Sequence, residues 1–248
     1  MKTTDDLLLE KMIELSKNES CNINTIKKKV LILSTPRSGS SMFCDVLSNT
    51  KQLGECAEWF NSRYIAAYGK MIGSPNVQFN DYLTFIMEKT VNNTGVFTVN
   101  AHIEHMYFFA SKKINLLNLN FDVIVYLSRK NKLKQAVSLA KSQVTDSWSS
   151  DVEEDKANLD LIKNSHIVNS LKHIVDSEEG YKEKLSQFTN KEFYYEDFSN
   201  VGKTTAFDEL FKMIDIPYKG AYAANTVRQS DGLSNNLYTA FESYLLNK

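Results

Sequence analysis

VLILSTPRSGSSMF, residues 30–43, is the stretch that decides the fold class. Residues 30–34 are aliphatic and partly β-branched, Pro36 and Gly39 are turn residues, and residues 42–47 have helical apolar spacing. We therefore predict a strand, a tight turn and a helix in succession. The stretch looks like a phosphate loop, but it has one glycine and no lysine and so does not match the motif of nucleotide triphosphatases.

The predicted turn nonetheless has the chemistry of an anion site. The first backbone N–H groups of a helix have no partner within the helix, and the helix dipole favours negative charge there. Hydroxyl donors come from Ser38, Ser40 and Ser41, and Arg37 supplies a planar cation suited to two oxyanion oxygens. From this loop alone, an ordinary serine-capped turn is an equally good interpretation.

Strands and helices alternate along the rest of the chain. Apolar runs predict strands at 29–34, 95–100, 121–127 and 192–195. Helical spacing predicts helices at 4–17, 40–49, 77–91 and 132–143, within 152–188, and from 204 onward apart from a loop at 230–234. This alternation indicates an α/β fold in which a P-loop-like parallel β-sheet is flanked by helices on both sides.

Length and composition narrow the classes of protein further. We expect one domain over 1–248, with a helical extension at 1–28 and an α/β core with helical insertions at 29–248. A formal net charge of −1 argues against a nucleic-acid-binding surface. Three cysteines and four scattered histidines predict a reducing compartment and no metal site. With no signal peptide or apolar membrane span readable, we expect a cytoplasmic protein.

A second candidate anion site follows the predicted strand at 121–127. Arg129 comes just after the strand end, and Ser138 lies about two turns into the next helix, so both can face one point. Ligands of parallel sheets bind at the carboxyl ends of the strands, where residues 35–41 also lie. Two anion anchors on adjacent strand ends predict a ligand with phosphates at both ends. Lys130 is the alternative phosphate contact. It can also simply be a solvent-exposed basic residue at the start of the next helix.

Together these motifs resemble the sulfotransferases. More narrowly, the chain is similar to the bacterial family of trehalose 2-sulfotransferase and lipopolysaccharide sulfotransferase-like proteins. The resemblance rests on TPRSGSSMFC, GECAEWF, GVFTVNAH, QAVSLAKSQ, YYEDF and RQSDGLS, which follow one another in the expected order between about residues 29 and 240. Asn100 is a departure, since the family often has lysine there.

The resemblance implies 3′-phosphoadenosine 5′-phosphosulfate (PAPS) as the sulfuryl donor, 3′-phosphoadenosine 5′-phosphate (PAP) as the product, and no metal. It implies that Arg37 stabilises charge on the leaving phosphate, so that this arginine fills the role of the missing lysine. The donor contacts that it implies are Arg37, Ser38, Gly39, Ser40, Ser41, Arg129, Ser138, Tyr195, Arg228 and Gln229. Tyr195 can equally be a packing residue beside the adenine.

Two residues compete for the role of general base. Glu58 lies where the bacterial family places its catalytic glutamate, and we expect partial burial beside Trp59 and Phe60 to raise its pKa. Glu58 can also simply be an acidic residue in the first turn of a helix, where such residues are common. His102 resembles the catalytic histidine of cytosolic sulfotransferases, and its ordinary explanation is packing at a strand end.

The expected acceptor contacts are Glu58, Trp59, His102 and Trp148. We therefore predict a sulfotransferase of EC class 2.8.2 that acts on a hydroxyl of a carbohydrate, a glycolipid or a small polar natural product. Sulfation of a nitrogen, a P-loop-like kinase and a non-catalytic nucleotide-binding module stay open as alternatives. The resemblance also implies a homodimer, and no membrane or nucleic-acid partner is expected.

Overall fold

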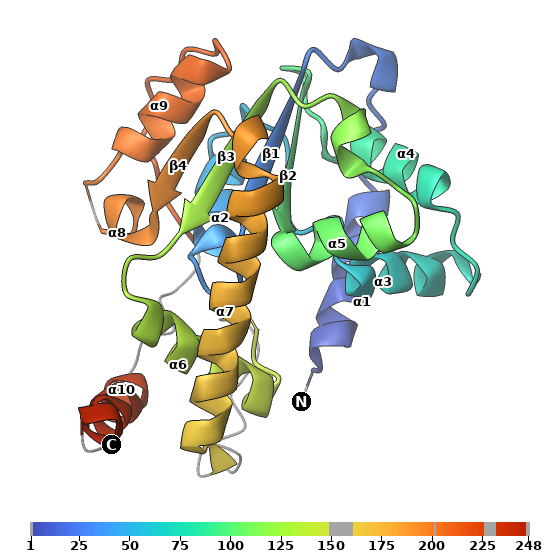
Figure 1. Ribbon diagram of the computed structural model, residues 1–248. Coiled ribbons are helices and arrows are strands. Elements are labelled where there is room, and N and C mark those ends of the chain that lie inside the picture. The colour runs from blue at the N-terminus through green and yellow to red at the C-terminus, as the bar shows by residue number, and fades with distance from the viewer. Residues whose placement is uncertain (1, 149–160, 201, 226–231, 247–248) are drawn as a thin grey trace.

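The computed structural model describes residues 2–148, 161–200, 202–225 and 232–246 (Figure 1). Its centre is a sheet of the strands β1 (Lys28–Ser34), β2 (Val96–His102), β3 (Val123–Ser128) and β4 (Lys191–Tyr194). The strand order is β2-β1-β3-β4, and every pair is parallel. The predicted α/β fold with a parallel sheet is therefore confirmed, and the strand from the opening stretch lies inside the sheet.

Helices cover both faces of the sheet because the central strand is apolar on both sides. Val30 and Ile32 face a core shared with α2 (Ser40–Asn49) and α9 (Thr205–Met213). Leu31 and Leu33 face the opposite core. That core is covered by α1 (Thr4–Ser16), α3 (Ser62–Ile72), α4 (Phe79–Thr90) and α5 (Ile103–Ser111). Figure 1 shows α9 on one side of the strands and α3, α4 and α5 on the other.

A third apolar cluster joins three helices from the second half of the chain. Ala136 and Val137 of α6 (Lys132–Thr145) pack with Ile167 of α7 (Asn164–Lys184) and Phe241 of α10 (Gly232–Leu246). Figure 1 shows α6 and α10 below the strand ends in this view, where the loops after β1 and β3 also emerge. The remaining helix is α8 (Tyr195–Phe198), which directly continues β4. Short 3₁₀ turns lie at Ile23–Thr25, Leu116–Leu119 and Ser186–Phe188.

The elements differ from the sequence predictions at several places, and one of them is α8, which takes Tyr195 from the strand predicted at 192–195. The helices α3 and α5 were not predicted, although Asn61 caps α3 through a bond to the Arg63 N–H and Gly73 ends it in the left-handed region. No turn residue separates β2 from the apolar α5, so its onset is hard to locate from sequence. The predicted helical segment 152–188 corresponds to α7 where the structure describes it. Residues 214–225 are not helical, and α10 begins inside the predicted 230–234 loop.

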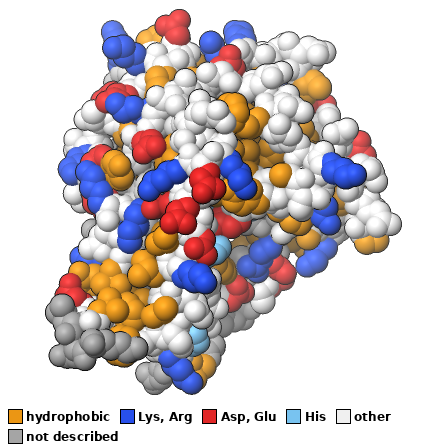
Figure 2. Space-filling model, in the orientation of Figure 1, with side chains coloured by type: hydrophobic (Ala, Val, Ile, Leu, Met, Phe, Trp, Pro, Cys, Tyr) orange, Lys and Arg blue, Asp and Glu red, His pale blue; other side chains and the backbone are white. Residues whose placement is uncertain are grey.

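The surface mixes both signs of charge. Figure 2 shows Lys and Arg side chains interspersed with Asp and Glu over this face, and hydrophobic side chains gather at its lower left, where α6 and α10 lie in Figure 1. Among the described residues, no helix is both long and apolar enough to cross a membrane.

Candidate active site

The loop between β1 and α2 has a backbone that only certain residues tolerate. Arg37 has φ 63° and Gly39 has φ 88°, both in the left-handed region. A Cβ atom at Gly39 would lie 2.4 Å from Cδ2 of Tyr195, so glycine is required by packing as well as by conformation. The loop is thereby wedged against α8, which begins at Tyr195.

Helix α6 fixes the same loop from the other side. Gln135 is fully buried, and its Nε2 donates hydrogen bonds to Thr35 Oγ1 at 2.9 Å and to the Pro36 carbonyl at 2.8 Å. One turn further, Ser138 Oγ accepts a hydrogen bond from Arg37 Nε at 2.9 Å, and the Trp148 carbonyl accepts one from Arg37 Nη1 at 3.0 Å. The loop conformation is thus specified by residues about a hundred positions away in the chain.

The loop presents polar groups suited to an anion. Gly39 is the N-cap of α2 and has no side chain that could cap the first N–H groups of this helix. Ser38 Oγ is buried and has no hydrogen-bond partner among the described residues. Ser40 is buried as well, whereas Ser41 is exposed. An uncapped helix N-terminus beside a buried hydroxyl and a cation fits a phosphate or sulfate group.

Glu58 and His102 lie next to each other beside this loop. His102 ends β2 and pairs in register with Ser34, the last residue of β1. Its Nε2 lies 3.4 Å from Oε1 of Glu58, which is within ion-pair range but beyond good hydrogen-bond geometry, and Nε2 is buried without a hydrogen-bond partner among the described residues. Asn61 Nδ2 donates to the other Glu58 oxygen at 3.1 Å. Glu58 precedes the N-cap of α3, so it does not start that helix.

The pKa of Glu58 differs from the expectation. Burial raises this pKa, but the neighbouring His102 and His105, the hydrogen bond from Asn61 and the Arg37 guanidinium together outweigh it, and the pKa lies below its usual value. The expected rise toward neutrality is therefore wrong for this structure, because two histidines and an arginine surround the carboxylate. Because Arg37 contributes to this lowering, the cation of the donor loop lies close enough to Glu58 to influence its charge.

His105, in the first turn of α5, is a third member of this group. Its Nδ1 accepts a hydrogen bond from the His102 backbone N–H at 3.1 Å, and the two imidazole rings lie 5.1 Å apart between centroids. Burial lowers the pKa of His105 to about 4, with a further contribution from His102. The histidines are therefore not all scattered, as we expected from sequence. Because α5 begins right after β2, one helical turn brings His105 back to His102.

The second anchor differs from the first in its partners. Arg129 directly follows β3, and its guanidinium lies 4.7 Å from the ring centroid of Tyr195. Lys130 is exposed and pairs with Asp197 at 3.0 Å. Glu196 accepts hydrogen bonds from the backbone N–H groups of Lys130 and Asn131 at 3.0 and 3.2 Å. Tyr195 thus lies between Gly39 of the first anchor and Arg129 of the second.

Several predicted residues have positions that limit their roles. Trp59 is fully buried, its indole N–H donates to the Glu55 carbonyl, and its own carbonyl accepts from the Tyr82 hydroxyl. Its side chain supports the Glu58 loop from within the core rather than lining an open pocket. Trp148 is half-buried, and its indole N–H donates to Asp146. Arg228 and Gln229 lie outside the described residues.

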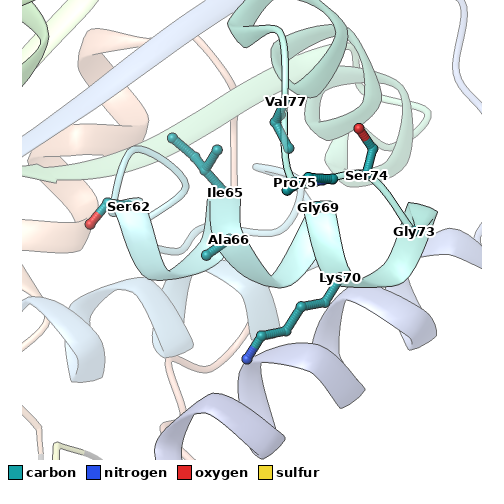
Figure 3. Close-up of a pocket in the computed structure, with 9 residues that line it drawn as sticks. All are labelled: Ser62, Ile65, Ala66, Gly69, Lys70, Gly73, Ser74, Pro75 and Val77. Atoms are coloured by element: carbon teal, nitrogen blue, oxygen red, sulfur yellow. The ribbon is translucent and has the colours of Figure 1, made fainter.

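A groove on α3 is separate from these groups. It has a volume of about 560 Å³ and is lined by Ser62, Ile65, Ala66, Gly69, Lys70, Gly73, Ser74, Pro75 and Val77 (Figure 3). Lys70 is the one titratable residue in this lining. The groove therefore has no carboxylate or imidazole among its lining residues.

Gln135 and His105 were not predicted as site residues from the sequence. Gln135 precedes Ser138 by three positions, so the two residues share one face of the helix. His105 follows His102 by three positions in the same way. The i, i+3 spacing was the available signal in both cases.

The fold and the loop define an α/β protein of P-loop-like architecture whose loop suits an anion without the phosphate-loop lysine. A family model described as Stf0 sulphotransferase matches residues 29–202, which include the loop, Glu58, His102, Arg129 and the YED segment. The chain belongs to this family of sulfotransferases. Membership implies transfer of a sulfuryl group from PAPS, and the uncapped helix start and buried Ser38 hydroxyl fit the phosphosulfate end of that donor. A search among curated proteins gave no match.

Proposed function

We propose that this protein transfers the sulfuryl group of PAPS to a hydroxyl group of a carbohydrate, a glycolipid or a small polar natural product. The observation that carries this proposal is the pair of Glu58 and His102, 3.4 Å apart and level with the end of β1. A proton acceptor at this place lies beside the loop that would hold the phosphosulfate. The homodimer and the cytoplasmic location expected from sequence stay predictions.

On the donor side, we assign the 5′-phosphosulfate to Arg37, the Ser38 and Ser40 hydroxyls and the first N–H groups of α2. Ser41 keeps its predicted role at the exposed rim of this loop. Arg129 is the favoured contact for the 3′-phosphate, because Lys130 is exposed and already pairs with Asp197. We propose that Tyr195, which lies close to Gly39 and Arg129, packs beside the nucleoside.

Ser138 has a second candidate role beside the predicted one. It is predicted as a direct 3′-phosphate contact together with Arg129, and its hydroxyl also accepts a hydrogen bond from Arg37. We propose that Ser138 orients the Arg37 side chain, and that Gln135 orients the backbone of the loop. Rigid positioning matters here because sulfuryl transfer, like phosphoryl transfer, depends chiefly on alignment and charge stabilisation.

The proposed acid–base step uses Glu58 and His102 as one unit. As the acceptor oxygen forms its bond to sulfur and the bridging S–O bond breaks, the acceptor proton passes to this pair, and negative charge develops on the leaving phosphate beside Arg37. The lowered pKa of Glu58 keeps it ionised at neutral pH, and the neighbouring imidazole gives the pair a second proton acceptor.

The experiment is a PAP-release assay with PAPS and a panel of hydroxyl and amine acceptors, using wild type, Glu58→Gln, His102→Gln and the double variant. We expect turnover with hydroxyl acceptors and a loss of about 10²-fold or more in kcat for each single variant. If the pair acts as a unit, the double variant loses little more than the worse single variant. Turnover with amines alone, or full activity in Glu58→Gln and His102→Gln, would contradict the proposal.

A further inference from the structure

The side chains of Glu58, His102 and His105 come from three elements and meet at one point. Glu58 lies in the loop before α3, His102 ends β2, and His105 is in the first turn of α5. One nitrogen of each histidine and one oxygen of the carboxylate lie within 4.8 Å of one another. Two imidazoles and one carboxylate form a donor set that Zn²⁺ uses in proteins, with a fourth position left for water or another ligand.

The distance between Glu58 and His102 fits a shared metal ion better than a hydrogen bond. Their closest atoms are 3.4 Å apart, whereas an N–H···O hydrogen bond is about 2.7–3.2 Å long. Ligands at about 2.0–2.1 Å from a tetrahedral Zn²⁺ are separated from each other by about 3.4 Å. His102 Nε2 is also buried without a hydrogen-bond partner among the described residues. An orphaned buried nitrogen of this kind commonly indicates an ion or a water.

Surrounding contacts hold two of the three side chains in place. Asn61 Nδ2 donates a hydrogen bond to Oε2 of Glu58, and the other carboxylate oxygen, Oε1, faces His102. His105 Nδ1 accepts from the His102 backbone N–H, so its Nε2 is the ring nitrogen available for an ion. Hydrogen bonds to metal ligands fix their orientation and strengthen binding. All three donor atoms lie within 4.8 Å of one another, so small side-chain adjustments would bring them to the separations of ligands on one ion.

We propose that Glu58, His102 and His105 bind a single Zn²⁺ ion. Binding would take up the carboxylate oxygen and the imidazole nitrogen that the proposed function assigns to proton transfer. Zinc would therefore inhibit sulfuryl transfer rather than support it. Only this inhibitory consequence rests on the proposed function, because ion binding itself does not depend on turnover.

The test is calorimetric titration of the chelator-treated protein with ZnCl₂, supported by the visible absorption of Co²⁺ in the same site. We expect one ion per chain, with affinity lowered at least tenfold in His105→Ala and in Glu58→Gln. His166→Ala is the matched control, because His166 Nδ1 also accepts a backbone N–H, that of Lys163 at 3.2 Å, but His166 does not belong to the cluster. Equal zinc affinity in wild type and both ligand variants would overturn the proposal, as would loss of binding in His166→Ala alone.

A second measurement separates this site from the proposed chemistry. In the PAP-release assay, zinc at concentrations that saturate the calorimetric site should abolish turnover of the wild type, and a chelator should restore it. Zinc binding that depends on His105 and Glu58 but leaves turnover intact would support the site and count against Glu58 and His102 as the base. Inhibition without such binding would overturn the site.

Discussion

Arg37 Nε donates a hydrogen bond to Ser138 Oγ at 2.9 Å, which ties the cation of the donor loop to the middle of α6. Because Arg37 has a left-handed backbone and its side chain spans two elements, its direction depends on this contact and on the Trp148 carbonyl. The relationship explains how an arginine without the flanking glycines of a phosphate loop can hold a fixed position.

Ser138→Ala removes this acceptor and should weaken PAP binding by several-fold, since one hydrogen bond to a charged group contributes about 1.5–3 kcal/mol, part of which water restores. Calorimetry with PAP measures the effect. Ser142→Ala is the control, because among the described residues Ser142 Oγ bonds to the Ser138 carbonyl of its own helix and not to the donor loop. Equal affinities for the two variants would show that Ser138 does not position Arg37.

Gln135→Met should weaken PAP binding and also lower the free energy of unfolding, because two buried hydrogen bonds to the loop are lost at about 1 kcal/mol each. Calorimetry and chemical denaturation give the two quantities. Gln187→Met, at an exposed position of the Ser186–Phe188 turn, is the matched control and should change neither quantity by much. Unchanged PAP affinity in Gln135→Met would contradict the positioning role.

Gly39→Ala should be much more damaging than Gly73→Ala. Both glycines have positive φ, and alanine there costs about 1–2 kcal/mol. Only at Gly39 does the new Cβ meet another residue, Tyr195 at 2.4 Å, while nothing lies within 4 Å at Gly73. Thermal unfolding and PAP affinity should both fall further for Gly39→Ala, and equal effects at the two positions would argue against close packing of Tyr195 on the loop.

Glu196 should make stability depend on pH in the acidic range. Burial raises its pKa, but backbone N–H groups of Lys130 and Asn131 and the charge of Arg129 lower it overall below 4.5. A depressed folded-state pKa contributes stability above the ordinary value, and this contribution is lost as the pH falls through the folded-state pKa. The difference in Tm between wild type and Glu196→Gln should therefore be largest near pH 7 and shrink below pH 4.5. A constant difference across this range would contradict the assignment.

The sheet and the donor loop were predictable from sequence because both depend on local patterns. The apolar run at 30–34, the Thr35–Ser41 turn and the strand ending at 127 fixed the parallel sheet and placed Arg37 and Arg129 at its carboxyl edge. The partners of these residues were not predictable in the same way. The hydrogen bond between Arg37 and Ser138 and the lowered pKa of Glu58 depend on helix rotation and on packing between distant segments.

The most direct test of the donor site is calorimetric titration with PAP of the wild type, Arg37→Ala, Arg129→Ala and Lys130→Ala, with AMP as the control ligand. We expect micromolar PAP binding, much weaker AMP binding, a loss on the order of 1.5–3 kcal/mol for each arginine variant, and little change for Lys130→Ala. Absence of PAP binding to the wild type, or equal affinity for PAP and AMP, would contradict the assignment of the two anchors to a phosphosulfate and a 3′-phosphate.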